Sequence, residues 1–184
     1  MNNQFNDLEK ILITKDEIEN RIAEIAKQIN DDYKDSDSLV MVCILRGSCY
    51  FFTDLTRLID KPCYLEFMSV SSYKGTVSSG EVSITRDISM PVAGKDLIVV
   101  EDIIDTGTTL SYLKKILAQR NPKSLKICSL LDKPSRRKVE IEGDYIGFEI
   151  PDKFVVGFGL DYNQLYRNLP DIGILKEEIY TKNA

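Results

Sequence analysis

The chain has 184 residues, of which 43% are hydrophobic and 29% are charged, so it can form one domain with a buried core. It contains no histidine, which excludes Ser-His-Asp and Cys-His mechanisms and most zinc sites, and leaves acid–base chemistry to Asp, Glu, Lys or Tyr. The net charge of −5 argues against a broad nucleic-acid-binding surface.

Strand and helix patterns alternate along the chain. A capping-box signature at residues 14–17 predicts an amphipathic helix that ends near Tyr33. Continuous apolar runs predict buried strands, and two further helices lie between them. The predicted strands are 39–45, 63–70, 97–100, 125–131, 145–150 and 154–160, and the two further helices are 47–59 and the segment that ends at Arg120. This order is typical of an α/β fold with an open, mostly parallel sheet flanked by helices.

The cellular location is predicted from what the chain lacks. No apolar run is long enough to span a membrane, and residues 1–5 do not resemble a signal peptide, so we expect a cytoplasmic protein without membrane partners.

The four cysteines, at positions 43, 49, 63 and 128, show no Cys-x-x-Cys spacing and lie mostly in apolar runs. This pattern is typical of reduced core thiols.

Residues 97–109 carry most of the functional information. An apolar strand ends in Glu101 and Asp102, Asp105 follows, and Thr-Gly-Thr-Thr then leads into an amphipathic helix. Hydroxyls and free N–H groups at a helix N-terminus form a phosphate site, whereas the acids suit sugar hydroxyls, Mg²⁺ or a proton in transit. An ordinary strand–helix connection with an N-cap would explain Asp105 or Thr106 alone, but not two acids at the end of a buried strand.

Polar residues also follow other predicted strands. Arg46 and Gly47 follow the first strand, Asp132 and Lys133 follow the fourth, and Asp161 follows the last apolar run. Ligands of open parallel sheets bind beyond the carboxyl ends of the strands. We therefore expect these groups to converge on one crevice.

Residues 97–109 resemble the phosphoribosyl-diphosphate (PRPP) motif of the type I phosphoribosyltransferases, in which four apolar residues, two acids, two apolar residues and Asp-Thr-Gly-x-Thr occur in this order. The segment is not a Walker loop, because Gly-x-x-x-x-Gly-Lys is absent. Further matches from about residue 40 to 168 resemble the members that act on 6-oxopurines. The resemblance implies one domain over residues 1–184, with a type I phosphoribosyltransferase fold, a small hood made by the terminal segments and a flexible active-site loop.

The resemblance also implies an enzymatic function. It is transfer of the 5-phosphoribosyl group from PRPP to N9 of hypoxanthine or guanine, with Mg²⁺, giving IMP or GMP and pyrophosphate in purine salvage. The enzyme would assemble as a homodimer or homotetramer. Two alternatives stay open: a phosphoribosyltransferase for another base such as xanthine, and a regulatory protein that binds PRPP. The net charge disfavours a nucleic-acid-binding regulator.

Each matched position takes a role from the resemblance. Asp105 is the acid–base residue near purine N7. The residues implied to hold the 5′-phosphate and ribose are Glu101, Asp102, Asp105, Thr106, Gly107, Thr108 and Thr109. Those implied to contact pyrophosphate are Leu45, Arg46, Gly47 and Arg167, where the Leu45–Arg46 peptide is often cis in the family and Arg46 replaces the usual lysine. Those implied to contact the purine are Lys133, Phe154, Val155 and Asp161, and the metal positions are Glu101, Asp102 and Asp161.

Residues 69–85 are rich in Ser, Thr and Gly, which allows two interpretations. The first is a simple mobile hairpin. The second is an active-site lid that excludes water from an electron-poor sugar carbon. The resemblance favours the lid, because Ser72 and Tyr73 match the Ser-Tyr pair of the family's flexible loop.

Overall fold

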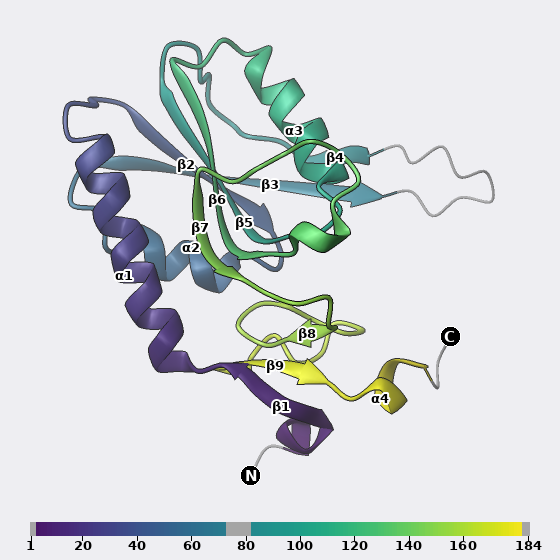
Figure 1. Ribbon diagram of the computed structural model, residues 1–184. Coiled ribbons are helices and arrows are strands. Elements are labelled where there is room, and N and C mark those ends of the chain that lie inside the picture. Colours follow the sequence, from purple (N-terminus) through teal and green to yellow (C-terminus); the bar gives the residue numbers. More distant parts are fainter. Residues whose placement is uncertain (1–2, 73–81, 182–184) are drawn as a thin grey trace.

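The computed structural model describes residues 3–72 and 82–181. Its main feature is a six-stranded sheet of order β4-β3-β2-β5-β6-β7 (Figure 1). Neighbouring strands pair in parallel except β3 and β4, which pair antiparallel at one edge. The strands are β2 (Leu39–Leu45), β3 (Cys63–Ser72), β4 (Val82–Arg86), β5 (Asp96–Ile104), β6 (Ser124–Asp132) and β7 (Tyr145–Glu149).

Helices cover both faces of this sheet. α1 (Lys15–Asp32) and α2 (Cys49–Thr56) pack on one face, and α3 (Thr108–Ala118) packs on the other (Figure 1). α1 begins with the predicted capping box at Thr14 and buries an isoleucine stripe, as its period of 3.6 residues requires. β2 is apolar throughout because both of its faces are covered.

The terminal segments form the predicted hood. β1 (Leu8–Ile13), β9 (Ile172–Leu175) and the short β8 (Val155–Val156) make a separate antiparallel sheet, which lies beyond the lower ends of the main strands in Figure 1. The hood also carries a 3-10 helix, η1 (Asn3–Asp7), and the short helix α4 (Glu177–Thr181). The Lys176 N–H donates to Asp7 O at 3.0 Å, so the two ends of the described chain are joined directly.

The predicted α/β fold is confirmed, but several predicted boundaries are wrong. β5 continues to Ile104, so Glu101 and Asp102 lie within the strand; backbone pairing to β6 extends to Ile104↔Asp132 because it does not depend on side-chain polarity. β3 reaches Ser72, two residues beyond its predicted end, and pairs antiparallel with β4, which agrees with the hairpin interpretation of residues 69–85. The strand predicted at 154–160 is only Val155–Val156, since positive φ angles from Gly157 to Gly159 end it.

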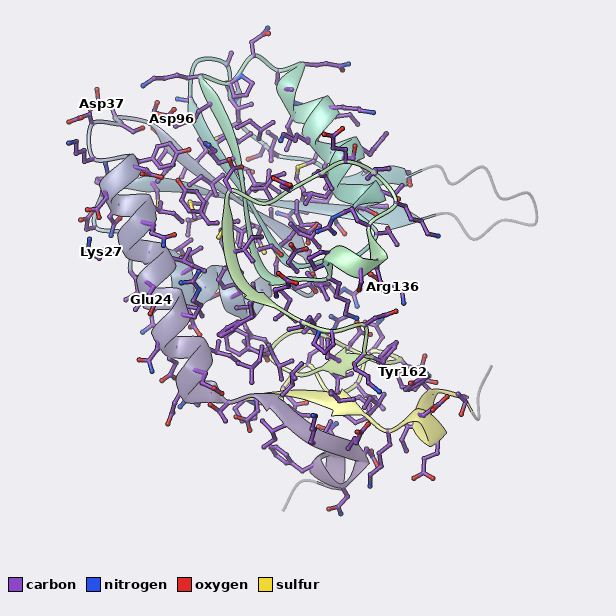
Figure 2. All side chains as sticks on the ribbon, viewed as in Figure 1. Glu24, Lys27, Asp37, Asp96, Arg136 and Tyr162 are labelled. Carbon is purple, nitrogen blue, oxygen red and sulfur yellow. The ribbon has the colours of Figure 1, made fainter. Side chains whose placement is uncertain are left out.

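Charged side chains lie mostly on the outside of these layers, with Asp96, Glu101 and Lys133 as buried exceptions. Glu24 and Lys27 project from the outer side of α1, and Lys27 pairs with Asp31 at 2.6 Å (Figure 2). Within the described residues, no helix is long and apolar enough to cross a membrane.

Candidate active site

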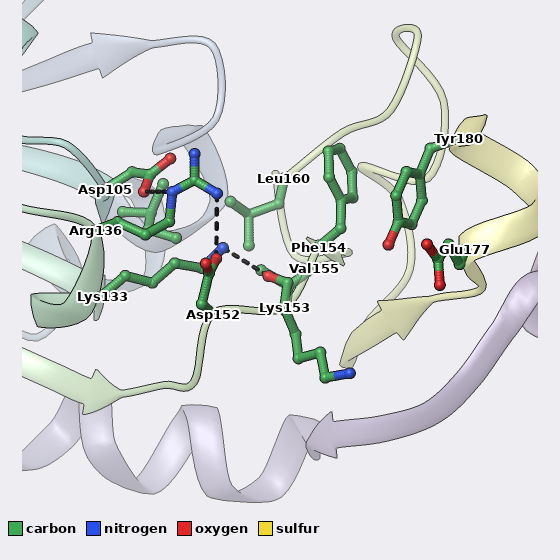
Figure 3. Close-up of a pocket in the computed structure, with 11 residues that line it drawn as sticks. Asp105, Lys133, Arg136, Asp152, Lys153, Phe154, Val155, Leu160, Glu177 and Tyr180 are labelled. Carbon is green, nitrogen blue, oxygen red and sulfur yellow. Dashed lines mark hydrogen bonds and ion pairs between the residues drawn. The ribbon is translucent and has the colours of Figure 1, made fainter. Parts of the chain in front are cut away.

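A cavity of about 520 Å³ lies between the carboxyl ends of β5 and β6 and the hood. In Figure 3, Asp105, Lys133 and Arg136 approach from the main sheet, and Phe154 and Tyr180 approach from the hood. The lining residues are Ile103, Asp105, Lys133, Arg136, Asp152, Lys153, Phe154, Val155, Leu160, Glu177 and Tyr180. Of the residues expected to share one crevice, Lys133 lines this cavity, whereas Arg46, Gly47, Asp132 and Asp161 do not.

The loop from Asp105 to Thr109 provides a phosphate-sized site. α3 begins after Gly107, whose φ of +80° is left-handed; this residue has no side chain to cap the helix, and the Thr108 N–H reaches Thr106 Oγ1 only at 3.5 Å. A Cβ on Gly107 would lie 2.5 Å from Ile141 Cγ2, so only glycine fits here. A small cavity of about 100 Å³ is lined by this loop and Glu101. Backbone N–H groups at an uncapped helix start favour an anion in this space.

Glu101 and Asp102 form an acidic pair in which Glu101 is buried and Asp102 is partly buried. Glu101 is only 8% exposed, and burial, followed by the charge of Asp102, raises its pKa well above the ordinary value. Burial likewise raises the pKa of Asp102 to about 6, although the positive charge of Arg167 acts in the opposite direction. Two desolvated carboxylates of like charge are stabilised by a cation or by hydroxyl donors.

The acidic residues fit a metal that arrives with its substrate. Among residues 3–72 and 82–181, no three side chains of His, Cys, Asp or Glu are clustered closely enough to hold a metal ion. Mg²⁺ commonly uses one or two carboxylates and takes its remaining ligands from phosphates and water, which Glu101 and Asp102 match. Asp161 is instead paired with Arg167 at 2.7 Å and accepts from the Gln164 N–H at 2.9 Å.

Two arginines meet beside the Leu45–Gly47 turn. The Leu45–Arg46 peptide is cis. Arg46 Nη1 and Arg167 Nη2 both donate to Gln164 Oε1, at 3.0 and 3.3 Å. This arrangement places two permanent positive charges near each other, as a diphosphate site requires.

The larger cavity contains groups suited to a planar heterocycle. Lys133 is 6% exposed and donates to Lys153 O at 2.6 Å, and burial lowers the pKa of its ammonium. An ammonium has three donors, so two are left for other acceptors. The Phe154 ring is stacked on Tyr180 with centroids 5.0 Å apart and lies edge-on to Tyr162 at 5.7 Å. Phe154 nevertheless stays 38% exposed, so part of its ring is open to a ligand.

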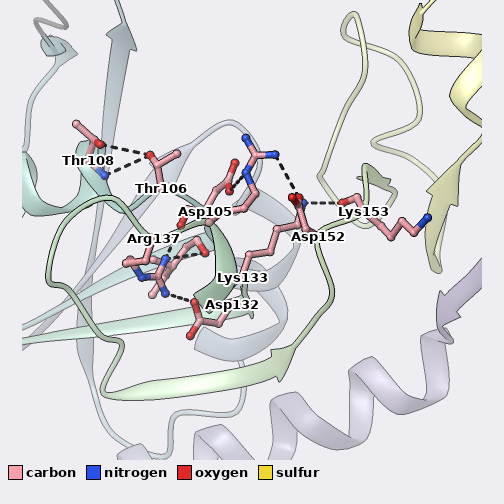
Figure 4. Close-up of polar contacts among 10 residues, drawn as sticks. Asp105, Thr106, Thr108, Asp132, Lys133, Arg137, Asp152 and Lys153 are labelled. Atoms are coloured by element: carbon pink, nitrogen blue, oxygen red, sulfur yellow. Dashed lines mark hydrogen bonds and ion pairs between the residues drawn. The ribbon is translucent and has the colours of Figure 1, made fainter.

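Several residues of the site were not predicted from the sequence. Arg136 pairs with Asp105 and Asp152, and Tyr180 and Glu177 line the cavity from α4. Arg137 donates to Ile104 O and Asp105 O at 3.0 and 2.5 Å and pairs with Asp132, which ties the phosphate loop to the end of β6 (Figure 4). For the two arginines, the one indication in the sequence was their position shortly after Lys133. Nothing in the sequence of α4 indicated that Glu177 and Tyr180 would line the site.

The structure brings some predicted residues together and leaves others untested. Lys133, Phe154 and Val155 line the larger cavity, and Asp105 lines both cavities. Glu101, Thr106, Gly107 and Thr109 line the smaller one, whereas Thr108 is exposed and lies within 3.4 Å of Thr106 through their hydroxyls (Figure 4). Tyr73 lies outside the described residues, and so does the side chain of Ser72, so their predicted role stays a prediction.

The sheet, the phosphate loop and the Glu101–Asp102 pair form a site with the groups that suit a phosphorylated sugar, at the carboxyl edge of an α/β sheet. Residues 12–163 match the family model of the phosphoribosyl transferase domain. The chain belongs to the type I phosphoribosyltransferase family, among the hypoxanthine-guanine phosphoribosyltransferases.

Individual relatives agree with this placement. The hypoxanthine-guanine phosphoribosyltransferase of Bacillus subtilis is 49% identical over 175 residues, covering 95% of this chain and 97% of the relative. The bifunctional protein TilS/HprT of Listeria monocytogenes is 51% identical over 178 residues, but this chain spans only 27% of its length. A crystal structure of a hypoxanthine phosphoribosyltransferase from Staphylococcus aureus superposes with a TM-score of 0.93 at 48% identity, covering 97% of both chains.

Proposed function

We propose that this protein transfers the 5-phosphoribosyl group from PRPP to N9 of hypoxanthine or guanine and releases pyrophosphate. One observation carries the proposal: Asp105, Lys133 and Phe154 surround a single cavity next to the phosphate loop. An acid–base group, a donor for a 6-oxo group and an aromatic face are the three contacts that a 6-oxopurine needs. The relatives named above support the same assignment.

The proposed chemistry is a substitution at the anomeric carbon. The lone pair of purine N9 forms the bond to C1′ while the bond from C1′ to the pyrophosphate oxygen breaks, and the leaving oxygen keeps that electron pair. The carboxylate of Asp105 accepts the proton that the base loses at N7. Lys133 donates to O6, and the backbone of Val155 meets the edge of the base. Phe154 stacks on the ring.

The sugar phosphate is held by the groups around β5. The N-terminus of α3 binds the 5′-phosphate, and Glu101 and Asp102 accept from the ribose hydroxyls. Arg46 and Arg167 bind the departing pyrophosphate. Glu101 and Asp102 are the carboxylates that would hold Mg²⁺, which would supply charge neutralisation on the diphosphate. Asp161, the third position implied for the metal, is paired with Arg167 in this structure.

The proposal also covers domain organisation, cellular location and assembly. Residues 1–184 act as a single domain in the cytoplasm, and the protein assembles as a homodimer or homotetramer. Sedimentation of the purified protein tests the assembly.

An assay with several bases tests the proposed function. PRPP and Mg²⁺ are combined with hypoxanthine, guanine, xanthine, adenine or uracil, and the nucleotide product is followed by absorbance. We expect IMP and GMP, and little product when Mg²⁺ is removed by a chelator. If the protein binds PRPP but forms no nucleotide with any of the five bases, the result would support the regulatory alternative and contradict the enzymatic proposal.

A further inference from the structure

Arg136 connects two carboxylates on the wall of the larger cavity. It is the last residue of the 3-10 turn η2 (Pro134–Arg136) that follows β6. Its Nε lies 2.8 Å from Asp105 Oδ1, and its Nη1 lies 3.2 Å from Asp152 Oδ1. In Figure 3 the guanidinium stands between the two carboxylates, and all three residues line the cavity.

The two oxygens of Asp105 have different surroundings. Oδ1 is closed off from solvent and accepts no hydrogen bond within the described part of the chain, so its ion pair with Arg136 is what compensates its burial. The Asp105 side chain as a whole is still 40% exposed. Since Oδ1 contributes almost nothing to this exposure, the accessible oxygen is Oδ2.

An acid–base carboxylate works only if one oxygen is aimed at the proton that it transfers. A carboxylate free to rotate presents either oxygen, and a misplacement of about 1 Å can cost about 10²-fold in rate. Holding one oxygen by a fixed cation leaves the other in a defined direction, in the way that an orienting group fixes a catalytic base. The planar guanidinium suits this task because it can contact two carboxylates at once.

We propose that Arg136 is a positioning residue that holds Asp105 Oδ1 and thereby presents Oδ2 to the base, while Asp152 holds the other side of the guanidinium. This inference rests on the proposed function. Arg136 then acts through Asp105 and makes no required contact with PRPP.

A double-mutant cycle tests the inference. Arg136→Gln should lower kcat by about 10- to 100-fold, with the KM for PRPP changed by less than about twofold. The same substitution made in Asp105→Asn should cause almost no further loss, because the group that it positions is already gone. Arg136→Lys should lie between the wild type and Arg136→Gln, and Asp152→Ala should lower kcat in the same direction but less.

Arg120→Gln is the matched control. Like Arg136, Arg120 is paired with a partly exposed aspartate: it donates to Asp87 at 2.9 and 2.7 Å, and neither residue lines the two cavities of the site. Its removal should leave kcat and both KM values unchanged. Thermal melts of every variant identify any loss that comes from unfolding, and Arg136→Lys keeps the test valid if Arg136→Gln does not fold.

The outcomes separate this inference from the proposed function. An equal loss of kcat in the wild-type and Asp105→Asn backgrounds would overturn the positioning role, and so would a raised KM for PRPP with kcat unchanged or a fully active Arg136→Gln. If the wild type makes no nucleotide, the proposed function fails instead. A crystal structure of Arg136→Gln then still tests the contact: we expect the Asp105 carboxylate to rotate, and an unchanged orientation would overturn the inference.

Discussion

Gly47 and Asp102 lie in direct contact, although Gly47 belongs to the turn after β2 and Asp102 belongs to β5. A Cβ placed on Gly47 would stand 1.5 Å from Asp102 Oδ2 and 2.5 Å from its Cγ. The carboxylate therefore fills the space that any other side chain at position 47 would need. The turn after β2 therefore packs directly against the acidic pair of β5. This contact places the proposed pyrophosphate site next to the proposed ribose site.

Gly47→Ala should therefore damage sugar-phosphate binding rather than the fold. The added methyl group must displace the Asp102 carboxylate or the turn, and we expect kcat/KM for PRPP to fall by about 10²-fold. Gly94→Ala is the control: Gly94 has a φ of +71° but no atom within 4 Å of a Cβ. That change should cost about 1 kcal/mol of stability and leave the kinetics intact. Equal kinetics for both variants would contradict the prediction.

Asp105→Asn should lower kcat by about 10²–10⁴-fold, because an amide cannot accept the proton that leaves the purine. The affinity for PRPP, measured by calorimetry, should change little. Asp105 lines both cavities, so a large loss of PRPP affinity with kcat retained would show that the residue only shapes the phosphate loop.

Lys133→Gln should weaken the use of hypoxanthine and guanine far more than the binding of PRPP. The buried ammonium donates to Lys153 O and keeps further donors for a 6-oxo group, whereas the 6-amino group of adenine offers donors where an acceptor is needed. Steady-state KM values for each substrate provide the measurement. Efficient use of adenine by the wild type would count against this role.

Tyr180→Ala should raise the KM for the purine by about 3- to 10-fold, since stacked aromatic pairs contribute about 0.5–1.5 kcal/mol. Tyr180 supports one face of Phe154, which leaves the other face for the base. Tyr180→Phe keeps the ring and should behave like the wild type. Tyr64→Ala serves as the control, because Tyr64 is 51% exposed and lies outside the cavity. A raised KM for PRPP alone would disagree with this support role.

Acid should remove a stabilising contribution of Asp87. Hydrogen bonds from Arg120 hold the pKa of Asp87 below its usual value. A carboxylate whose pKa is lower in the folded state stabilises that state above its unfolded pKa, near pH 4, and the contribution is lost as the pH falls through the folded value. Asp87→Asn should therefore lower Tm slightly at pH 7, and the difference should disappear at strongly acidic pH. A difference that is constant from pH 3 to 8 would refute this origin.

Much of the fold could be predicted because its signals are local. The isoleucine stripe of α1 and the fully apolar β2 reflect burial on one side and on two sides, and such periodicity does not depend on distant residues. The phosphate loop is one continuous segment that leads from β5 to α3, so its hydroxyls, glycine and acids were visible together. The end of β5 was placed too early because strand pairing continues under polar side chains.

The rest depends on contacts between segments that are far apart in the chain. The ion pair of Arg136 with Asp105, the stacking of Tyr180 on Phe154 and the contact of Gly47 with Asp102 arise only when the strands are ordered in the sheet and the hood is packed against it. No local pattern marks these pairs. The sequence alone thus determined most helices and strands of the main sheet, the phosphate loop and the chemical groups available, because these follow from local periodicity and residue type. Only the tertiary structure decided which of those groups touch, because sheet order and hood packing bring distant side chains within contact distance.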